Sequence, residues 1–349
     1  MLKGLLKSFI IHSGLWSAIR ANERKKSGAG ISILYGHRVL PDRIIEDKSD
    51  ARRITGHTSV SQVAAAIKLL NKYYKIISID EAVQNLKDNN VSEESVVLTF
   101  DDGFGDNFKY LYPLLKELNT PATFYVNPSV VGTNKNLWFQ SIINFFFAIP
   151  DSHYYMKINS TRYELDTPEK RYSAAFDFMQ YIQAEHKPQS FINLIEEIMG
   201  DLSNPQELDF HMSWSDLSIL ASDPLITIGA HTQHHFPLGY CDEELSKMEI
   251  FQSVADIENK LGSKVDHFSY PRGHSEDFSQ FHIDYLKSIN VKSATSTIRG
   301  VNRGGDDLFS LKRIGFPQKI IGDETDFLWY VSGIPQLLKE LKNKFKARR

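Results

Sequence analysis

The feature of this sequence that most constrains its fold is a repeated unit, an apolar, β-rich run that ends directly in polar residues. Helical periodicities at 60–74, 108–118 and 244–261 lie between such runs, so strands and helices alternate, which is the pattern of a parallel sheet. Seven or eight units predict a barrel, in which side chains at the carboxyl ends of the strands form the site. The runs are 31–35, 75–79, 96–100, 122–126, 225–230, 267–270, 292–298 and, as a candidate eighth, 311–316.

One segment interrupts this alternation. Residues 127–224 separate two of the runs, and the stretch 137–204 within them is rich in aromatic residues and helical in character. We interpret this stretch as an insertion that lies over the mouth of the barrel. The sequence leaves two roles open for it, a lid that faces the substrate or a helical subdomain that does not.

Composition sets the class of protein. The 349 residues allow two domains, but a single α/β barrel also reaches this size. With 42% hydrophobic and 24% charged residues the chain is typical of a globular protein, and disorder is excluded. A single cysteine, Cys241, excludes an internal disulfide framework. Because no run of 18 apolar residues occurs, we expect no transmembrane helix.

Both ends of the chain are basic. Residues 1–26 and 339–349 each carry a net charge of +5, so the rest carries −13 against a total of −3. An acidic body argues against nucleic acid as a partner. Apolar residues at near-helical spacing in 2–19 fit a basic amphipathic helix on an anionic membrane surface, or a helix packed on the body. The C-terminal stretch fits the same two alternatives.

We therefore divide the chain into a basic N-terminal arm (1–26), a barrel (27–330) and a basic C-terminal helix (331–349). Lys7 and His12 interrupt the apolar stretch that a secretory signal would need, and no small-residue cleavage site follows. We expect a cytoplasmic protein, with peripheral contact to the inner face of a membrane through its basic ends.

Two adjacent carboxylates, Asp101 and Asp102, follow the run at 96–100 in the motif Thr-Phe-Asp-Asp-Gly. Neighbouring side chains at a strand end point in different directions, so one carboxylate can bind a metal while the other takes a proton from water. The alternative is a turn with a helix cap, since Asp-Gly pairs are common in turns. A calcium loop is excluded, because Tyr112 occupies the twelfth position, where a bidentate Glu is needed.

Three histidines occur within five residues after the run at 225–230. His231 and His235 stand four apart, a spacing that brings two imidazoles to one ion, whereas His234 points elsewhere on a turn. Two histidines and one carboxylate leave positions open for water and substrate. The set predicts one divalent ion in a hydrolytic site, with zinc as the expected ion, although Fe(II), Co(II) and Mn(II) accept the same ligands.

A third motif, Phe-Ser-Tyr-Pro-Arg-Gly, occupies 268–273 at the end of a strand. Tyr270 and Pro271 begin a sharp turn whose backbone N–H groups suit an oxyanion hole. An ordinary turn is the alternative, and it would be favoured if the other two motifs were absent.

The three motifs, in this order, resemble those of the polysaccharide deacetylase family (NodB homology domain) over residues 31–316. The resemblance implies a distorted (β/α)7 barrel and an enzyme that removes acetyl groups, usually N-acetyl, from glycans such as chitin, peptidoglycan and bacterial exopolysaccharides. Position by position, it implies that the metal ligands are Asp102, His231 and His235, that the general base is Asp101, and that the oxyanion donor is the backbone N–H of Arg272, beside Tyr270.

The chain departs from the family pattern at the residue that orients the base. Many members carry an arginine two residues before the motif proline, and this chain has Ser269 there. Arg272, Arg299 and Arg313 are the candidates to replace that arginine, and the sequence does not choose among them.

A second departure concerns the general acid. The late Leu-x-x-His motif of many members is absent here. Members that modify exopolysaccharides instead carry a Tyr-His pair on the first strand, and Tyr35-Gly36-His37 resembles this pair with one extra residue. The resemblance therefore makes His37 the expected acid, with His274 as its main rival and His57 as a third candidate.

The leading expectation is a metal-dependent deacetylase of a surface or extracellular glycan, or of its precursor. The first alternative is a hydrolase of non-glycan amides, for which the insertion would form a closed small-molecule pocket. An open groove lined by Tyr and Trp would favour a glycan. The second alternative is a non-catalytic glycan-binding relative, against which the intact Asp101, Asp102, His231 and His235 argue.

Deleting residues 1–20 should lower binding to anionic liposomes, because the deletion removes the basic, apolar stretch proposed to contact the membrane. Deacetylase activity in solution should survive. Cosedimentation with vesicles and an activity assay test both points. An insoluble or inactive truncation would favour a helix that belongs to the body.

Overall fold

The computed structural model describes residue 25 and residues 28–47, 57–158, 160–185, 187–199 and 211–335. The N-terminal arm expected at 1–26, apart from residue 25, lies outside these ranges. The expected C-terminal helix lies outside them from residue 336 onward. No helix within the described ranges has both the length and the apolar character needed to cross a membrane.

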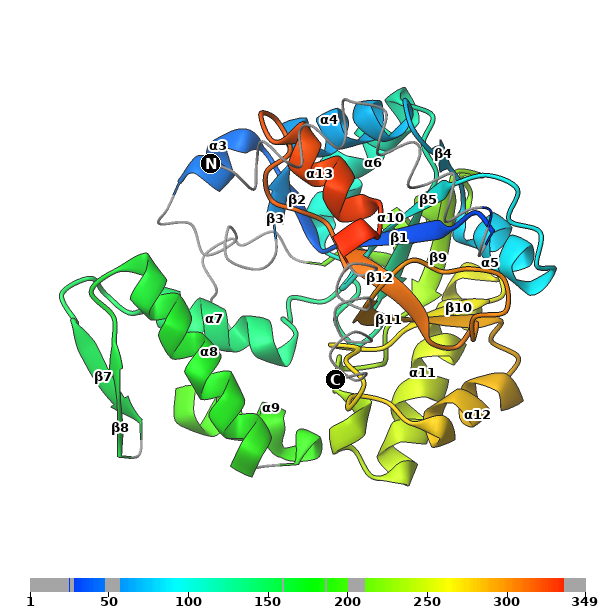
Figure 1. Ribbon diagram of the computed structural model, residues 1–349. Coiled ribbons are helices and arrows are strands. Elements are labelled where there is room, and N and C mark those ends of the chain that lie inside the picture. Colours follow the sequence, from blue (N-terminus) through cyan, green and yellow to red (C-terminus); the bar gives the residue numbers. More distant parts are fainter. Residues whose placement is uncertain are drawn as a thin grey trace, which may run out of the picture.

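Seven parallel strands close into a barrel (Figure 1). Around the ring the order is β1, β12, β11, β10, β9, β6 and β5, and β5 pairs again with β1. The expected (β/α)7 barrel is thereby confirmed. Its strands are β1 (Ile31–Gly36), β5 (Ser95–Phe100), β6 (Ala122–Val126), β9 (Ile226–Ala230), β10 (His267–Ser269), β11 (Ser293–Arg299) and β12 (Leu311–Gly315).

Two of the expected strands take different places. The run at 311–316, the candidate eighth strand, is the seventh strand of the ring. The run at 75–79 contributes only β4 (Lys75–Ile76), which pairs with the start of β5 outside the ring. The chain turns helical at Ile79 because the Ser78 hydroxyl accepts a hydrogen bond from the N–H of Glu81 and caps the new helix.

Helices connect the strands, with a small parallel sheet of β2 (Arg38–Leu40) and β3 (His57–Ser59) beside the barrel. The helix expected over 60–74 ends at Leu70, and the one expected over 108–118 is a π-helical turn, η2 (Asn107–Leu111), followed by α6. The helices are α3 (Asp42–Glu46), α4 (Val60–Leu70), α5 (Ile79–Lys87), α6 (Tyr112–Glu117), α10 (Trp214–Ala221), η3 (Leu238–Tyr240), α11 (Glu243–Leu261), α12 (Gln280–Ser288) and α13 (Glu324–Val331).

Both faces of the barrel strands are covered. Successive residues of a strand point to opposite faces, and Leu34 and Leu98 accordingly belong to one buried apolar cluster while Ile33 and Val97 belong to another. All six residues of β5 are buried. Polar side chains therefore become accessible where the strands end, and this is where the three sequence motifs lie.

The described residues of the stretch 137–204 form a separate helical layer with a β-hairpin. Its own apolar cluster includes Phe146, Phe178 and Phe191. The buried Arg171 joins two of its elements, because its guanidinium donates to the backbone carbonyl of Phe146 at 2.9 Å. The elements are α7 (Trp138–Ala148), β7 (Tyr155–Ile158), β8 (Thr161–Glu164), α8 (Pro168–Glu185) and α9 (Pro188–Met199).

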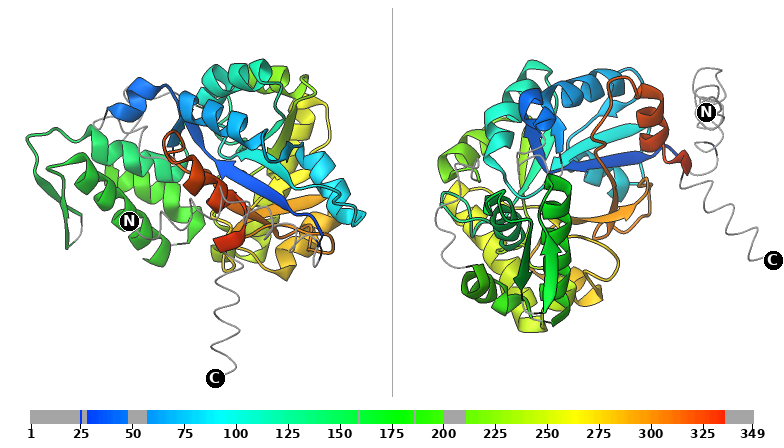
Figure 2. Two further views of the ribbon diagram at one scale, coloured as in Figure 1. Left: turned by 45° about the horizontal axis from the view of Figure 1, so that its top comes forward. Right: turned by 90° about the vertical axis from the view of Figure 1, so that its left-hand side faces the viewer.

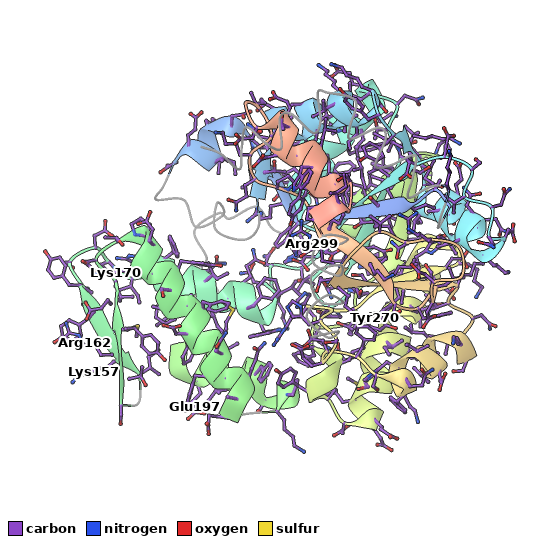
Figure 3. All side chains as sticks on the ribbon, viewed as in Figure 1. Lys157, Arg162, Lys170, Glu197, Tyr270 and Arg299 are labelled. Carbon is purple, nitrogen blue, oxygen red and sulfur yellow. The ribbon has the colours of Figure 1, made fainter. Side chains whose placement is uncertain are left out.

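This insertion lies beside the barrel in Figure 1 and in the left view of Figure 2. Lys157 and Arg162 lie on the β7–β8 hairpin, on the side of the insertion that faces away from the barrel (Figure 3). The other side, formed by α7 and α8, faces the ends of the barrel strands and lines a cleft together with them.

Candidate active site

The carboxylate of Asp101 is held by one arginine, and that arginine is Arg313. Nη1 and Nη2 of Arg313 donate to the two carboxylate oxygens of Asp101, each at 2.8 Å. Both side chains are almost fully buried. Arg313 also donates to the Ser269 hydroxyl at 3.0 Å and to the Ser296 carbonyl at 2.8 Å. A bidentate pair of this kind fixes the orientation of the carboxylate.

The sequence left open which arginine orients the base in place of the missing family arginine, and the structure places Arg313 in that position. It lies on β12, and Ser269, at the position where many family members have the arginine, accepts one of its hydrogen bonds. The other two candidates are occupied elsewhere: Arg272 donates to Gln183 at 3.0 Å, and the Arg299 guanidinium lies 3.8 Å from the ring centre of Tyr330.

The charge of Asp101 follows from this pair. Burial by itself would raise the pKa of the Asp101 carboxyl, but its neighbours, the Arg313 guanidinium foremost and then His231, together outweigh burial and lower that pKa to about 2. Asp101 is therefore an ionised carboxylate throughout the physiological pH range, which is the form that can accept a proton.

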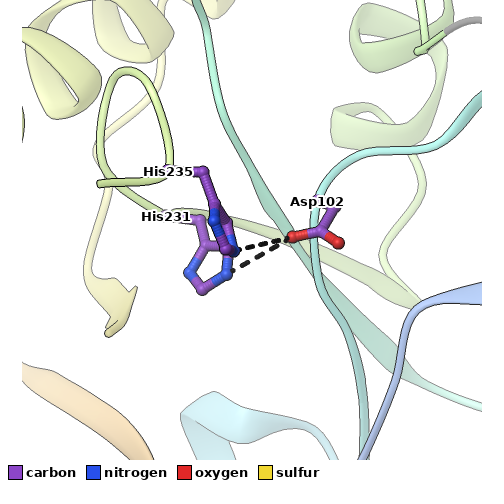
Figure 4. Close-up of side chains that lie close together, drawn as sticks. All are labelled: Asp102, His231 and His235. Atoms are coloured by element: carbon purple, nitrogen blue, oxygen red, sulfur yellow. Dashed lines mark ion pairs between the residues drawn. The ribbon is translucent and has the colours of Figure 1, made fainter. Parts of the chain in front are cut away.

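Asp102, His231 and His235 converge on one point. Oδ1 of Asp102 lies 3.5 Å from Nε2 of His231 and 3.3 Å from Nε2 of His235 (Figure 4). All three residues are buried, and their ligand atoms lie within 4.8 Å of one another. Donor atoms bound at 2.0–2.1 Å to a tetrahedral zinc ion are about 3.3–3.4 Å apart, so the observed spacings match a shared ion.

The backbone around the two histidines sets their ring orientation. Nδ1 of His231 donates to the Ser269 carbonyl at 2.6 Å, which leaves the lone pair of Nε2 facing Asp102. Thr232 and His235 both have left-handed backbone conformations, with φ of +61° and +60°. The Asn127 amide secures this loop by donating to the carbonyls of His231 and Thr232.

His234 points away from the site, as the sequence predicts. Its backbone N–H and its Nδ1 both interact with the buried carboxylate of Glu249, at 2.8 and 2.6 Å. Its ring stacks on Phe236.

The donor set fits a divalent cation. Within the described residues, the buried Oδ1 of Asp102 has no hydrogen-bond donor. Burial and the neighbouring Asp101 raise the pKa of Asp102 well above its ordinary value, so its ionised form needs a further positive charge. Burial also lowers the pKa of His231 to about 4 and that of His235 well below its ordinary value. Neutral imidazoles and an uncompensated carboxylate are metal ligands.

The insertion contributes two residues that sequence reasoning missed. Trp138, the first residue of α7, donates its indole N–H to the carbonyl of His235 at 3.2 Å. The ring of Phe139 lies 4.8 Å from the His235 ring. The aromatic content of 137–204 was the available signal, but it could not show which aromatic residues reach the histidine.

The cleft above these residues has a volume of about 760 Å³. Its lining includes the candidate proton donors His37 and His274 and the candidate substrate-site residues Tyr270 and Arg272, but not His57, which lies in β3. Tyr35 and His37 stand two apart at the end of β1, with ring centres 5.9 Å apart. Burial lowers the pKa of His37, and the Asp101 carboxylate opposes that effect. His274 is exposed, and its Nδ1 lies 3.3 Å from the Thr297 hydroxyl.

The Tyr-Pro turn brings Tyr270 and Arg272 to the cleft. The Tyr270 hydroxyl donates to the Phe309 carbonyl at 3.0 Å, and its ring stacks on Phe278 with centres 4.1 Å apart, so this side chain forms a fixed wall. Arg272 adopts a left-handed conformation with φ of +59°, and Gly273 donates its N–H to the Pro271 carbonyl at 2.6 Å. This turn places Arg272 in the lining of the cleft.

Comparisons with known proteins identify the family. The sequence model described as polysaccharide deacetylase matches residues 88–293, more than half of the chain. The chain is also 31% identical over 67 residues to "Putative polysaccharide deacetylase YxkH" of Bacillus subtilis (strain 168), a match that covers 19% of this chain and 24% of that protein. The matched segment thus spans about a quarter of that curated relative.

Two solved structures have a similar fold. The deacetylase PplD of Streptococcus pyogenes, in complex with acetate, is 15% identical with a TM-score of 0.53, covering 84% of this chain and 94% of its own. IcaB from Ammonifex degensii is 18% identical with a TM-score of 0.53, covering 88% of this chain and 98% of its own. The fold and the family model define a hydrolase of the deacetylase class. The chain belongs to the polysaccharide deacetylase family.

Replacing Arg313 should move the acid limb of the pH profile. In Arg313→Gln, burial of Asp101 acts without the opposing guanidinium, so the pKa of Asp101 rises and its active, ionised form is lost at a higher pH. We expect the acid limb of kcat/KM to shift upward by about one to three units. Arg313→Lys, which keeps the charge, should shift it less. An unchanged limb in folded, metal-loaded Arg313→Gln would contradict the role of Arg313.

Proposed function

We propose that the protein is a metal-dependent hydrolase that removes acetyl groups, N-acetyl in the first place, from a bacterial surface or extracellular polysaccharide or its precursor. The observation that carries this proposal is the pairing of a buried, ionised Asp101 with an adjacent set of one carboxylate and two neutral imidazoles. Acetate, the ligand of the similar PplD structure, is the acid that such a reaction would release.

Each residue has a defined part in the proposed reaction. A divalent ion held by Asp102, His231 and His235, zinc in our expectation, would lower the pKa of water and polarise the acetyl carbonyl. Asp101, oriented by Arg313, accepts a proton from the attacking water. The backbone N–H of Arg272 donates to the oxygen on which negative charge develops. The C–N bond then breaks as the amine nitrogen receives a proton.

His37 is the proposed donor of that proton. It lies deeper in the site than His274 and interacts electrostatically with Asp101, whereas His274 is exposed at the cleft and contacts Thr297. The extra residue between Tyr35 and His37 supports this choice. With this spacing Tyr35, on β1, and His37, the residue that follows the strand, both line the cleft.

The shape of the cleft favours a glycan over a small amide. Three aromatic residues that line it, Tyr172, Phe176 and Tyr240, have 40%, 49% and 41% of their surface exposed. Exposed rings along an open wall are suited to a chain of sugars, while the alternative substrate class would require an enclosed pocket.

The place of action is proposed from the sequence alone. The charge of +5 on each end supports peripheral contact with an anionic membrane, on its cytoplasmic face. A precursor glycan presented there would be within reach of the cleft. The liposome experiment with the chain lacking residues 1–20 tests the membrane contact.

Acetate release from a substrate panel tests the function. We expect acetate from N-acetylated oligosaccharides and not from simple N-acetylated amines, with complete loss after chelation. His231→Ala should lose the metal, measured by elemental analysis. Asp101→Asn should keep it and lose about 10²- to 10⁴-fold in turnover, because an amide cannot accept the proton. Release confined to non-glycan amides would favour the alternative hydrolase, and unchanged metal content in His231→Ala would refute the ligand set.

Substituting the two cleft histidines separates their roles. His37→Ala should lower turnover by about 10²- to 10⁴-fold with metal content intact. A proton donor must be protonated to act, so activity falls as the pH rises through its pKa, and His37→Ala should lose this alkaline limb. His274→Ala is the matched control and should keep near-normal turnover. The reverse result would assign the proton donor to His274.

A further inference from the structure

The cleft has a second wall that the chemistry of deacetylation does not use. This wall is the face of α8 that is turned toward the barrel. Arg171, Ala175 and Phe178, on another face of the helix, are buried in the insertion. The residues of α8 that line the cleft recur at helical spacing: Tyr172, Phe176, Met179, Gln180, Gln183 and Ala184.

The residue types on this wall are those that suit sugar units. Tyr172 and Phe176 are four residues apart, with ring centres separated by 6.4 Å, and both are exposed, by 40% and 49%. A pyranose ring has an apolar C–H face that can cover an aromatic ring and remove its surface from water. Gln180 and Gln183 carry amides that can both donate to and accept from hydroxyl groups. None of the described residues of α8 that line the cleft is charged.

The wall is joined to the reaction site. Gln183 accepts a hydrogen bond at 3.0 Å from the side chain of Arg272, whose backbone forms the proposed oxyanion turn. The Arg272 guanidinium also lies 5.4 Å from the ring centre of Tyr240, the exposed aromatic residue contributed by the barrel side. Rings from both sides of the cleft therefore line the same cavity as the metal ligands.

We propose that the α8 wall, which belongs to the insertion, binds the sugar units next to the one being deacetylated, and that Tyr172 and Phe176 set how strongly the reaction depends on glycan length. This inference rests on the proposed deacetylase function and deepens it. Tyr172 and Phe176 would be the main determinants, because each presents a ring that neither the metal site nor the base requires.

A chain-length series tests the proposal. The substrates are N-acetylglucosamine oligomers of one to six units, in β-1,4- and β-1,6-linked forms, and the readout is kcat/KM for acetate release. For the wild type we expect kcat/KM to rise with length in at least one series. The double variant Tyr172→Ala/Phe176→Ala should lose about 10- to 100-fold on the long oligomers and little on the shortest, because burial of an aromatic ring against sugar is lost only there.

Tyr154→Ala is the matched control. Tyr154 is also an exposed aromatic residue of the insertion, 67% exposed, but it does not line the cleft. This variant should keep the full dependence on chain length. All three substituted residues are exposed, so unfolding temperatures should stay close to that of the wild type.

Binding without turnover gives an independent readout. The hexamer should bind the Asp101→Asn form measurably in calorimetry, and about 10- to 100-fold more weakly when Tyr172 and Phe176 are also replaced. Equal kcat/KM at all lengths, or a double variant that matches Tyr154→Ala, would overturn the α8 proposal while acetate release upholds the deacetylase function. Absence of acetate from every oligomer with metal-loaded enzyme would overturn both.

Discussion

The site depends on the buried ion pair between Asp101 and Arg313. Two adjacent carboxylates removed from water cannot both ionise unless positive charge compensates them. Arg313 balances one, and its remaining N–H groups donate to Ser269, Ser296 and Thr99, so burial of the guanidinium leaves none of its donors unpaired. The second negative charge, on Asp102, has no such partner among the described residues. A divalent cation bound by this carboxylate and the two neutral imidazoles would balance that negative charge.

The chain places these groups by accepting unfavourable backbone conformations. Asp102, Thr232, His235 and Arg272 all have positive φ without being glycine. Each such residue costs about 1–3 kcal/mol and persists only where its surroundings hold it. The Asn127 amide and the Trp138 indole supply part of that restraint at the histidine loop, through its backbone carbonyls. Among the described non-glycine residues with positive φ, all those that are not asparagine thus lie in the three motifs.

Features set by local sequence patterns could be predicted from the sequence, whereas features set by which strands lie next to one another could not. The alternation of strands and helices predicted the barrel, the spacing of His231 and His235 predicted a shared ion, and the resemblance to the deacetylase family added Asp102 to that set. The choice of Arg313 required knowing that β12 borders β1, which in turn borders β5, and no local pattern carries that order. The prediction of a full strand at 75–79 was wrong, because the helix capped by Ser78 outweighed the β-propensity of these residues. Likewise, the aromatic content of 137–204 predicted an insertion, but it did not show which face of its helices lines the cleft.

The insertion links substrate recognition to the metal ligands. Its α7 begins with Trp138, which holds the carbonyl of His235, and its α8 carries the exposed rings along the cleft. The two helices share one apolar cluster, in which Phe146 packs against Phe178 with ring centres 6.0 Å apart. The indole that holds the His235 carbonyl and the helix that carries the exposed rings therefore belong to one packed cluster, so the proposed glycan wall and one metal ligand are supported by the same apolar core.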